Sequence, residues 1–104
     1  MRILYKEPLK DAVEMDIEDD INIMQELVGG YIETVKLLPE VDMVVVVNEM
    51  GKLEQLKPNI ISGEDVLVGN IFFIGIDIPE MRGLSERELE LAKLICNRLD
   101  IRNL

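Results

Sequence analysis

Histidine is absent from this 104-residue chain, and cysteine occurs only once, as Cys96. Without imidazole, the chain lacks the commonest general base, the commonest metal ligand and any catalytic triad built on histidine. A single cysteine excludes an internal disulfide and is typical of a reduced, intracellular compartment. Cys96 falls on the apolar stripe of a predicted helix with no neighbouring histidine to activate it. We therefore expect a structural thiol there.

Other absences narrow the class of protein further. The longest apolar runs, such as residues 43–47, have the length of a strand and fall far short of a membrane span. The start of the chain shows no signal-peptide pattern. No phosphate loop of the type G-x-x-x-x-G-K-S/T occurs. These absences predict a soluble protein of the host-cell cytoplasm, with no cofactor and no membrane partner.

Basic charge is also scarce. The 21 acidic residues outnumber 11 basic ones, for a formal net charge of −10, and the basic residues are scattered. We therefore expect no direct binding to nucleic acid. Five acidic residues lie close together: Glu14, Asp16, Glu18, Asp19 and Asp20. They form either a solubilising surface or a mimic of nucleic-acid phosphates. They lack the glycine and the closing glutamate of a calcium loop, so we predict no metal site.

Hydrophobic patterning predicts an α+β fold in a single domain, residues 1–104. Alternating or β-branched segments predict strands at residues 2–7, 12–17, 31–37, 43–48, 52–56 and 66–76. The segment 12–17 has the pattern of a strand with one buried and one exposed face, and residues 58–63 have the composition of a loop. We expect a twisted, mainly antiparallel sheet of five or six strands.

Two helices complete the predicted fold. A short helix at about residues 20–28 is capped by an aspartate and ended by Gly29. A C-terminal helix at about residues 85–100 begins with a capping box formed by Ser85 and Glu88. Two further glycines punctuate the strands. Gly51 is predicted to adopt a positive φ in a turn, and Gly69 to mark a bulge or a close backbone approach.

Four pieces of the sequence carry a family resemblance. They are L-V-G-G-Y-I-E at 27–33, N-E-M-G-K-L at 48–53, P-N at 58–59 and D-V-L-V-G-N-I-F at 65–72. Together they resemble an uncharacterised domain family of small phage, plasmid and bacterial proteins, over about residues 1–77. The resemblance implies a setting in a phage or another mobile element and no assigned reaction. The C-terminal helix lies outside this match, so we expect its role to be particular to this chain.

Backbone geometry and core packing explain most of the matching residues. The polar ones are explained less well, and five of them form the candidate ligand-binding site: Tyr31, Glu33, Asn48, Lys52 and Asn59. Two interpretations are open for the asparagines. They either cap turns with their side-chain amides or join the other residues in a polar pocket. Such a pocket, with Tyr31 as a stacking surface, would bind a small ligand such as a nucleotide derivative.

These observations favour a binding protein over an enzyme. We expect a non-enzymatic protein of a phage or mobile element that acts as an anti-defence factor. It would sequester a nucleotide-like small molecule or inhibit a host protein. Its exposed strand edges also favour a homo-oligomer. The alternatives are an acidic mimic that binds a host DNA- or RNA-binding protein, and a small hydrolase or lyase that uses a carboxylate pair.

Overall fold

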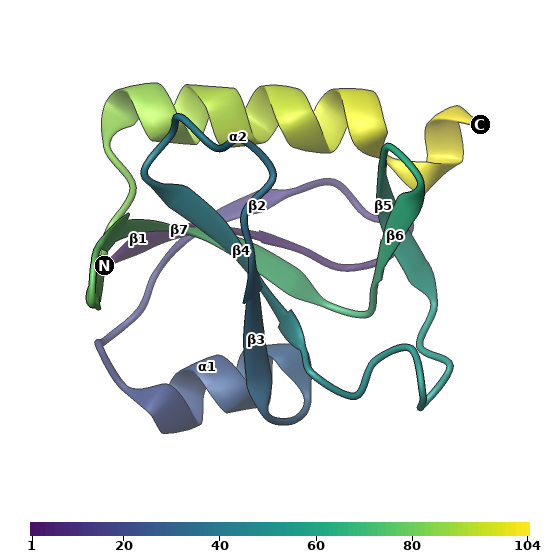
Figure 1. Cartoon of the computed structure of the whole chain (residues 1–104), viewed down its shortest axis with the longest axis horizontal. Helices are drawn as coiled ribbons and strands as arrows, with labels where there is room; N and C mark the ends of the chain where they lie inside the picture. Colours follow the sequence, from purple (N-terminus) through teal and green to yellow (C-terminus); the bar gives the residue numbers. More distant parts are fainter.

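The computed structural model describes residues 1–104 and shows an antiparallel sheet with one helix on each face (Figure 1). The strands of this sheet have the order β2-β1-β7-β4-β3, and β8 pairs with β7. Their bounds are Arg2–Lys6 (β1), Val13–Asp16 (β2), Ile32–Val35 (β3), Met43–Asn48 (β4), Ile71–Asp77 (β7) and Glu80–Arg82 (β8). The predicted α+β fold with a mainly antiparallel sheet is confirmed.

Both helices begin as the sequence predicts. The side chain of Asp20 accepts a hydrogen bond at the start of α1 (Ile21–Val28), and Gly29 ends this helix with a φ of 81°. Ser85 and Glu88 form a reciprocal capping box at the start of α2 (Glu86–Leu99). A short 3-10 helix, η1 (Ile101–Asn103), follows. Neither α-helix is long and apolar enough to cross a membrane.

The segment between β4 and β7 departs most from the prediction. Residues 58–62, predicted as part of a loop, form β5 (Pro58–Ser62), which pairs with β6 (Asp65–Val68) in a separate two-stranded sheet. Residues 52–56, predicted as a strand, instead contain a series of turns at 52–55. The amide of Leu56 donates to the carbonyl of Gly51 at 3.0 Å. The chain therefore coils back on itself there, and Leu53 is left 77% exposed rather than facing a core.

Two glycines have different roles from those predicted. Gly51 does not have a positive φ; in this turn the positive φ of 56° belongs to Gln55. A Cβ on Gly51 would lie 2.9 Å from a methyl carbon of Val68, so close packing requires glycine there. Gly69, with a φ of 75°, turns the chain between β6 and β7 instead of forming a bulge. The close neighbour of Gly69 is a side chain, because a Cβ on Gly69 would lie 2.7 Å from Cδ1 of Leu56.

Two apolar cores lie on opposite faces of the sheet. The larger core is covered by α2, which contributes Leu89, Ala92 and Cys96. The smaller core is covered by α1, which contributes Met24 and Val28. Successive residues of β4 enter the two cores in turn, so this strand is buried on both faces as its valine run predicts.

The edge strand β2 is exposed on both faces, so the predicted half-buried strand at residues 12–17 is wrong in its burial. Val13 is 55% exposed and Met15 is 36% exposed. Both belong to the apolar set of the alternating pattern, but α1 packs mainly on β3, β4 and β7 and leaves these two side chains exposed. The pattern therefore identifies the strand without identifying it as an uncovered edge.

Candidate functional site

A cavity of about 320 Å³ lies between β3–β4 and β6. We call it the β3–β6 cavity. Its apolar walls come mainly from the strands, and its polar groups come from the strand ends and from the turn after β4. The lining residues are Glu33, Val35, Val47, Asn48, Glu49, Lys52, Leu53, Asp65, Val66, Leu67 and Val68. Three of the five predicted site residues, Glu33, Asn48 and Lys52, thus line the same cavity.

Negative charge predominates in this cavity. Its lining contains the carboxylates of Glu33, Glu49 and Asp65 and one ammonium group, that of Lys52. Lys52 forms an ion pair with Asp65, and this hydrogen bond lowers the pKa of the Asp65 carboxyl below its usual value. Glu33 is exposed and lies on the edge strand β3. The cavity therefore suits a ligand with hydrogen-bond donors or positive charge next to an apolar part.

Asn48 lines the cavity, and both the oxygen and the nitrogen of its side-chain amide form hydrogen bonds within the chain. Its Oδ1 accepts from the Met50 amide at 2.8 Å. Its Nδ2 donates to the Val28 carbonyl at 3.3 Å and to Glu54 at 3.4 Å. Asn48 is 5% exposed, and it joins the end of α1 to the turn after β4. Asn48 therefore caps the turn and also lines the cavity, so the two interpretations do not exclude each other for this residue.

Asn59 lies outside the cavity, in a second polar cluster. Its side chain is fully buried: Oδ1 accepts from Lys6 Nζ at 2.8 Å, and Nδ2 donates to the carbonyls of Lys6 and Gly69 at 2.8 Å each. It therefore ties β5 to β1 and to the turn between β6 and β7. Because these partners are distant in sequence, neither the capping of a local turn nor a shared pocket with the other predicted residues describes Asn59.

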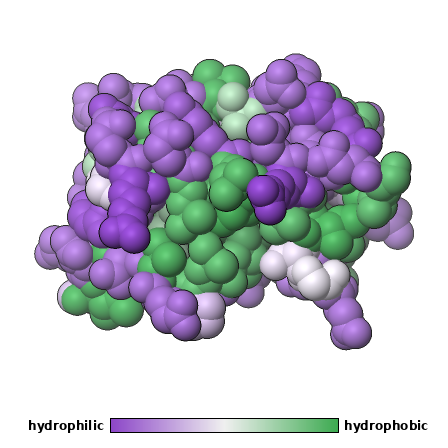
Figure 2. Space-filling model, turned by 90° about the horizontal axis from the view of Figure 1, so that it is seen from above, coloured by the Kyte–Doolittle hydropathy of each residue, from purple (hydrophilic) through white to green (hydrophobic).

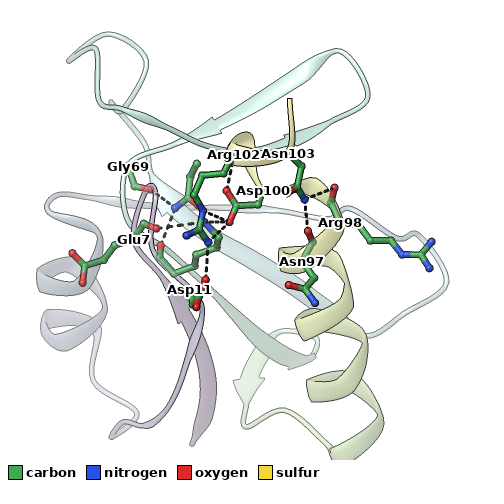
Figure 3. A network of polar contacts seen from close by, with 10 residues as sticks. Glu7, Asp11, Gly69, Asn97, Arg98, Asp100, Arg102 and Asn103 are labelled. Carbon is green, nitrogen blue, oxygen red and sulfur yellow. Dashed lines mark hydrogen bonds and ion pairs between the residues drawn. The ribbon is translucent and has the colours of Figure 1, made fainter.

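A buried lysine organises this second cluster. Lys6 is 1% exposed, and its Nζ lies 3.2 Å from Oδ2 of Asp100. Asp100 also accepts from Nη2 of Arg102 at 2.6 Å, and Arg102 reaches Asp11 at 2.8 Å. Figure 3 shows the labelled side chains of Asp11, Asp100 and Arg102 turned toward one another. We call Lys6, Asn59, Asp100 and Arg102 the Lys6 centre.

The Lys6 centre fully satisfies its own polar groups. Hydrogen bonds from Arg102, helped by the charge of Lys6, hold the pKa of Asp100 well below its usual range. No buried side-chain nitrogen or oxygen in the chain lacks a hydrogen-bond partner. Sequence reasoning missed this centre. The available signal was the position of Lys6, which alternates in phase with the core residue Leu4 in β1.

Tyr31 and Cys96 take no part in the β3–β6 cavity. Tyr31 is 71% exposed and does not line it. Cys96 is buried on the inner face of α2, and this burial raises the pKa of its thiol to about 12. The thiol therefore stays protonated at neutral pH, in agreement with the structural role expected for it. No group of three or more histidine, cysteine, aspartate or glutamate residues is arranged to hold a metal ion.

The structure defines the class as a small α+β domain with a helix on each face of an antiparallel sheet and an acidic, apolar-walled cavity. A family model described as "Domain of unknown function (DUF3846)" matches residues 1–97, and the chain belongs to this family. The match extends past residue 77 and includes most of α2. This helix is therefore part of the family domain and not particular to this chain. No curated protein and no solved structure matched the chain.

Proposed function

We propose that this protein is a non-enzymatic binding protein whose ligand occupies the β3–β6 cavity. Its role would be that of an anti-defence factor of a phage or other mobile element, which sequesters a small polar molecule or inhibits a host protein. One observation carries the binding role: Glu33 of the first motif lines one cavity together with Asn48 and Lys52 of the second. The biological setting rests on the family resemblance.

The size and chemistry of the cavity support binding. Its volume of about 320 Å³ falls at the lower end of the roughly 300–1,000 Å³ typical of ligand pockets. Such pockets combine apolar walls with a few polar groups that orient the ligand. Carboxylates outnumber ammonium groups here. A nucleotide-like ligand would therefore direct its base or ribose, rather than its phosphates, toward Glu33 and Glu49.

Catalysis receives less support from the same residues. Lys52 and Asp65 neutralise each other in an ion pair, and the Cys96 thiol is buried and protonated.

The acidic segment also has local roles that compete with the mimicry of nucleic acid. Glu14 lies 3.3 Å from Lys93, and Asp20 caps α1. For the proposed homo-oligomer, support comes from apolar side chains left exposed on β2, Val13 and Met15.

The binding role is tested by filling the cavity. Val66 lines it, and Val66→Trp should occupy its space, whereas Val13→Trp places the same side chain on the opposite edge strand. Protein purified from its native host is analysed by native mass spectrometry for a retained small molecule, and by calorimetry against cyclic nucleotides. We expect retention or binding by the unaltered chain and by Val13→Trp, and its loss in Val66→Trp. Equal binding by all three proteins would place the ligand elsewhere, and binding by none would contradict the proposal.

A further inference from the structure

The outer edge of β3 is an unpaired sheet edge beside the β3–β6 cavity. β3 ends the strand order, and its partner is β4. The amide of Glu49 donates to the carbonyl of Tyr31 across this pair at 2.8 Å. Bonded and non-bonded residues alternate along an antiparallel pair, so Glu33 and Val35 also bond to β4. The backbone groups of Ile32 and Thr34 therefore point outward, free to pair with another chain.

The opposite edge of the sheet differs in the side chains at these outward positions. Met1 and Ile17 exchange two backbone hydrogen bonds, of 2.6 and 2.9 Å. By the same alternation, the outward residues of β2 are Glu14 and Asp16. Charged side chains on an edge strand discourage pairing with another strand. The outward residues of β3 are uncharged, so β3 is the edge better suited to accept a strand.

An added strand would place every second side chain on the cavity side of β3. Glu33 and Val35 point to that side, since both line the cavity. Residues of the added strand opposite them would face the same way. A basic side chain opposite Glu33 would also approach the acidic cavity wall, and an apolar one opposite Val35 would extend the α2-side core. Figure 2, viewed from the side of α2, shows a continuous apolar area bordered by hydrophilic residues.

We propose that β3 binds an extended segment of a partner protein by strand addition. The segment carries a lysine or arginine two residues from an apolar residue, and the basic side chain enters the cavity beside Glu33. This proposal rests on the proposed binding function, because it uses the same cavity. A second copy of the chain suits the edge less well. Pairing two β3 strands through both outward residues places Glu33 opposite Glu33, and like charges in this position are destabilising.

Fluorescence anisotropy tests the charge and spacing of the segment. The probe is the labelled peptide Thr-Lys-Thr-Val-Thr-Lys-Thr-Val, and the control peptide has glutamate in place of lysine. We expect the lysine peptide to bind the full chain, more weakly as salt concentration rises. The glutamate peptide should bind at least about tenfold more weakly, and Glu33→Gln should weaken binding of the lysine peptide by about fivefold. Equal binding of the two peptides would overturn the proposal.

A second experiment tests whether the peptide pairs with the outer edge of β3. Thr34→Pro removes an outward N–H without removing a bond to β4, whereas Thr34→Val keeps that N–H. We expect Thr34→Pro to lose peptide binding and Thr34→Val to retain it. Hydrogen exchange on the unaltered chain decides the matter if Thr34→Pro fails to fold. On peptide binding, the amides of Ile32 and Thr34 should gain protection, while β4 already protects those of Glu33 and Val35. Unchanged exchange at Ile32 and Thr34 would rule out strand addition.

The outcomes separate this proposal from the proposed function. If the peptide does not bind but a small molecule is lost in Val66→Trp, strand addition is wrong and the cavity remains a ligand site. If neither ligand binds, both proposals fail. A dimeric mass in light scattering that reverts to a monomer in Thr34→Pro would identify the occupant as a second copy and overturn the choice of a cationic partner.

Discussion

The β3–β6 cavity and the Lys6 centre both gather polar residues on the α2 side of the sheet, but they differ in what those residues have left to bind. In the Lys6 centre, Lys6 is 1% and Asn59 0% exposed, and every buried side-chain nitrogen and oxygen has a partner within the chain. In the cavity, Glu33 is exposed on the edge strand β3 and Lys52 is exposed in the turn after β4. Burial with complete hydrogen bonding is typical of scaffold, whereas exposure beside apolar walls is what the proposed binding site requires.

The largest effect should come from breaking the Lys6 centre. Lys6→Met leaves the carboxylate of Asp100 buried and removes the donor to Asn59 Oδ1. We expect the free energy of unfolding to fall by about 3 kcal/mol, because the buried Asp100 carboxylate keeps only Arg102 as a cationic partner and Asn59 Oδ1 is left without its donor. Urea denaturation of Lys6→Met measures this loss. Lys10→Met is the matched control, since the Lys10 side chain is 68% exposed, and it should change stability by less than about 0.5 kcal/mol. Similar losses in the two variants would contradict the structural role of Lys6.

Asn59 should show a smaller effect of the same kind. Asn59→Ala leaves the carbonyls of Lys6 and Gly69 without their donor and Lys6 Nζ without one acceptor. We expect a loss of about 2 kcal/mol in urea denaturation, against a change within about 0.5 kcal/mol for the exposed Asn22→Ala. If Asn59 belonged to the ligand site instead, Asn59→Ala would weaken ligand binding while leaving stability unchanged.

Breaking the Arg82–Glu88 pair should have an intermediate effect on stability, because this pair is partly buried. Hydrogen bonds from Arg82, with help from the Ser85 amide, hold the pKa of Glu88 at about 2, against an ordinary 4.5. A carboxyl that is more acidic in the folded state stabilises the fold above its unfolded pKa. This contribution should disappear as pH falls from about 4.5 to about 2. The lowered pKa of Asp100 acts in the same direction.

Glu88→Gln tests this pH dependence. We expect about 1.5 kcal/mol less stability at neutral pH and a flatter loss of stability on acidification than in the unaltered chain. Urea midpoints measured across the acidic range provide the comparison. Glu90→Gln is the control, because the exposed Glu90 lies 3.7 Å from Lys93 and makes a weaker pair. Parallel pH profiles for Glu88→Gln and the unaltered chain would show that this pair does not govern acid unfolding.

The features that sequence alone predicts correctly are those encoded within a few neighbouring residues. The capping box of Ser85 and Glu88, the helix end at Gly29 and the buried valine run of β4 are of this kind. Each depends on hydrogen bonds or packing patterns that are local in the chain. The resemblance added Glu33, Asn48 and Lys52, which line one cavity although Glu33 is distant in sequence from the other two.

The features that sequence misses depend on partners far away in the chain. β5 pairs with its sequence neighbour β6, but the fully buried Asn59 within β5 bonds to β1, 53 residues away. Lys6 is buried because Asp100, near the other end of the chain, compensates its charge. The exposure of β2 likewise follows from its place at the edge of the sheet. Alternation and composition describe a residue and its neighbours, so they do not encode these contacts.

The smallest effect on stability should come from a substitution in the cavity, Lys52→Ala. The same substitution also tests which charge the ligand carries. Lys52 pairs with Asp65 while their side chains remain 65% and 52% exposed, so Lys52→Ala should cost less than about 1 kcal/mol. The effect of Lys52→Ala on binding should be larger, and it should have opposite signs for a cationic peptide and an anionic nucleotide. Without Lys52, the carboxylates of Glu33, Glu49 and Asp65 are uncompensated. A cationic peptide should then bind about threefold more tightly, whereas an anionic nucleotide held by Lys52 would bind more weakly. Titration of Lys52→Ala with both ligands distinguishes a site that selects positive charge from one that selects phosphate.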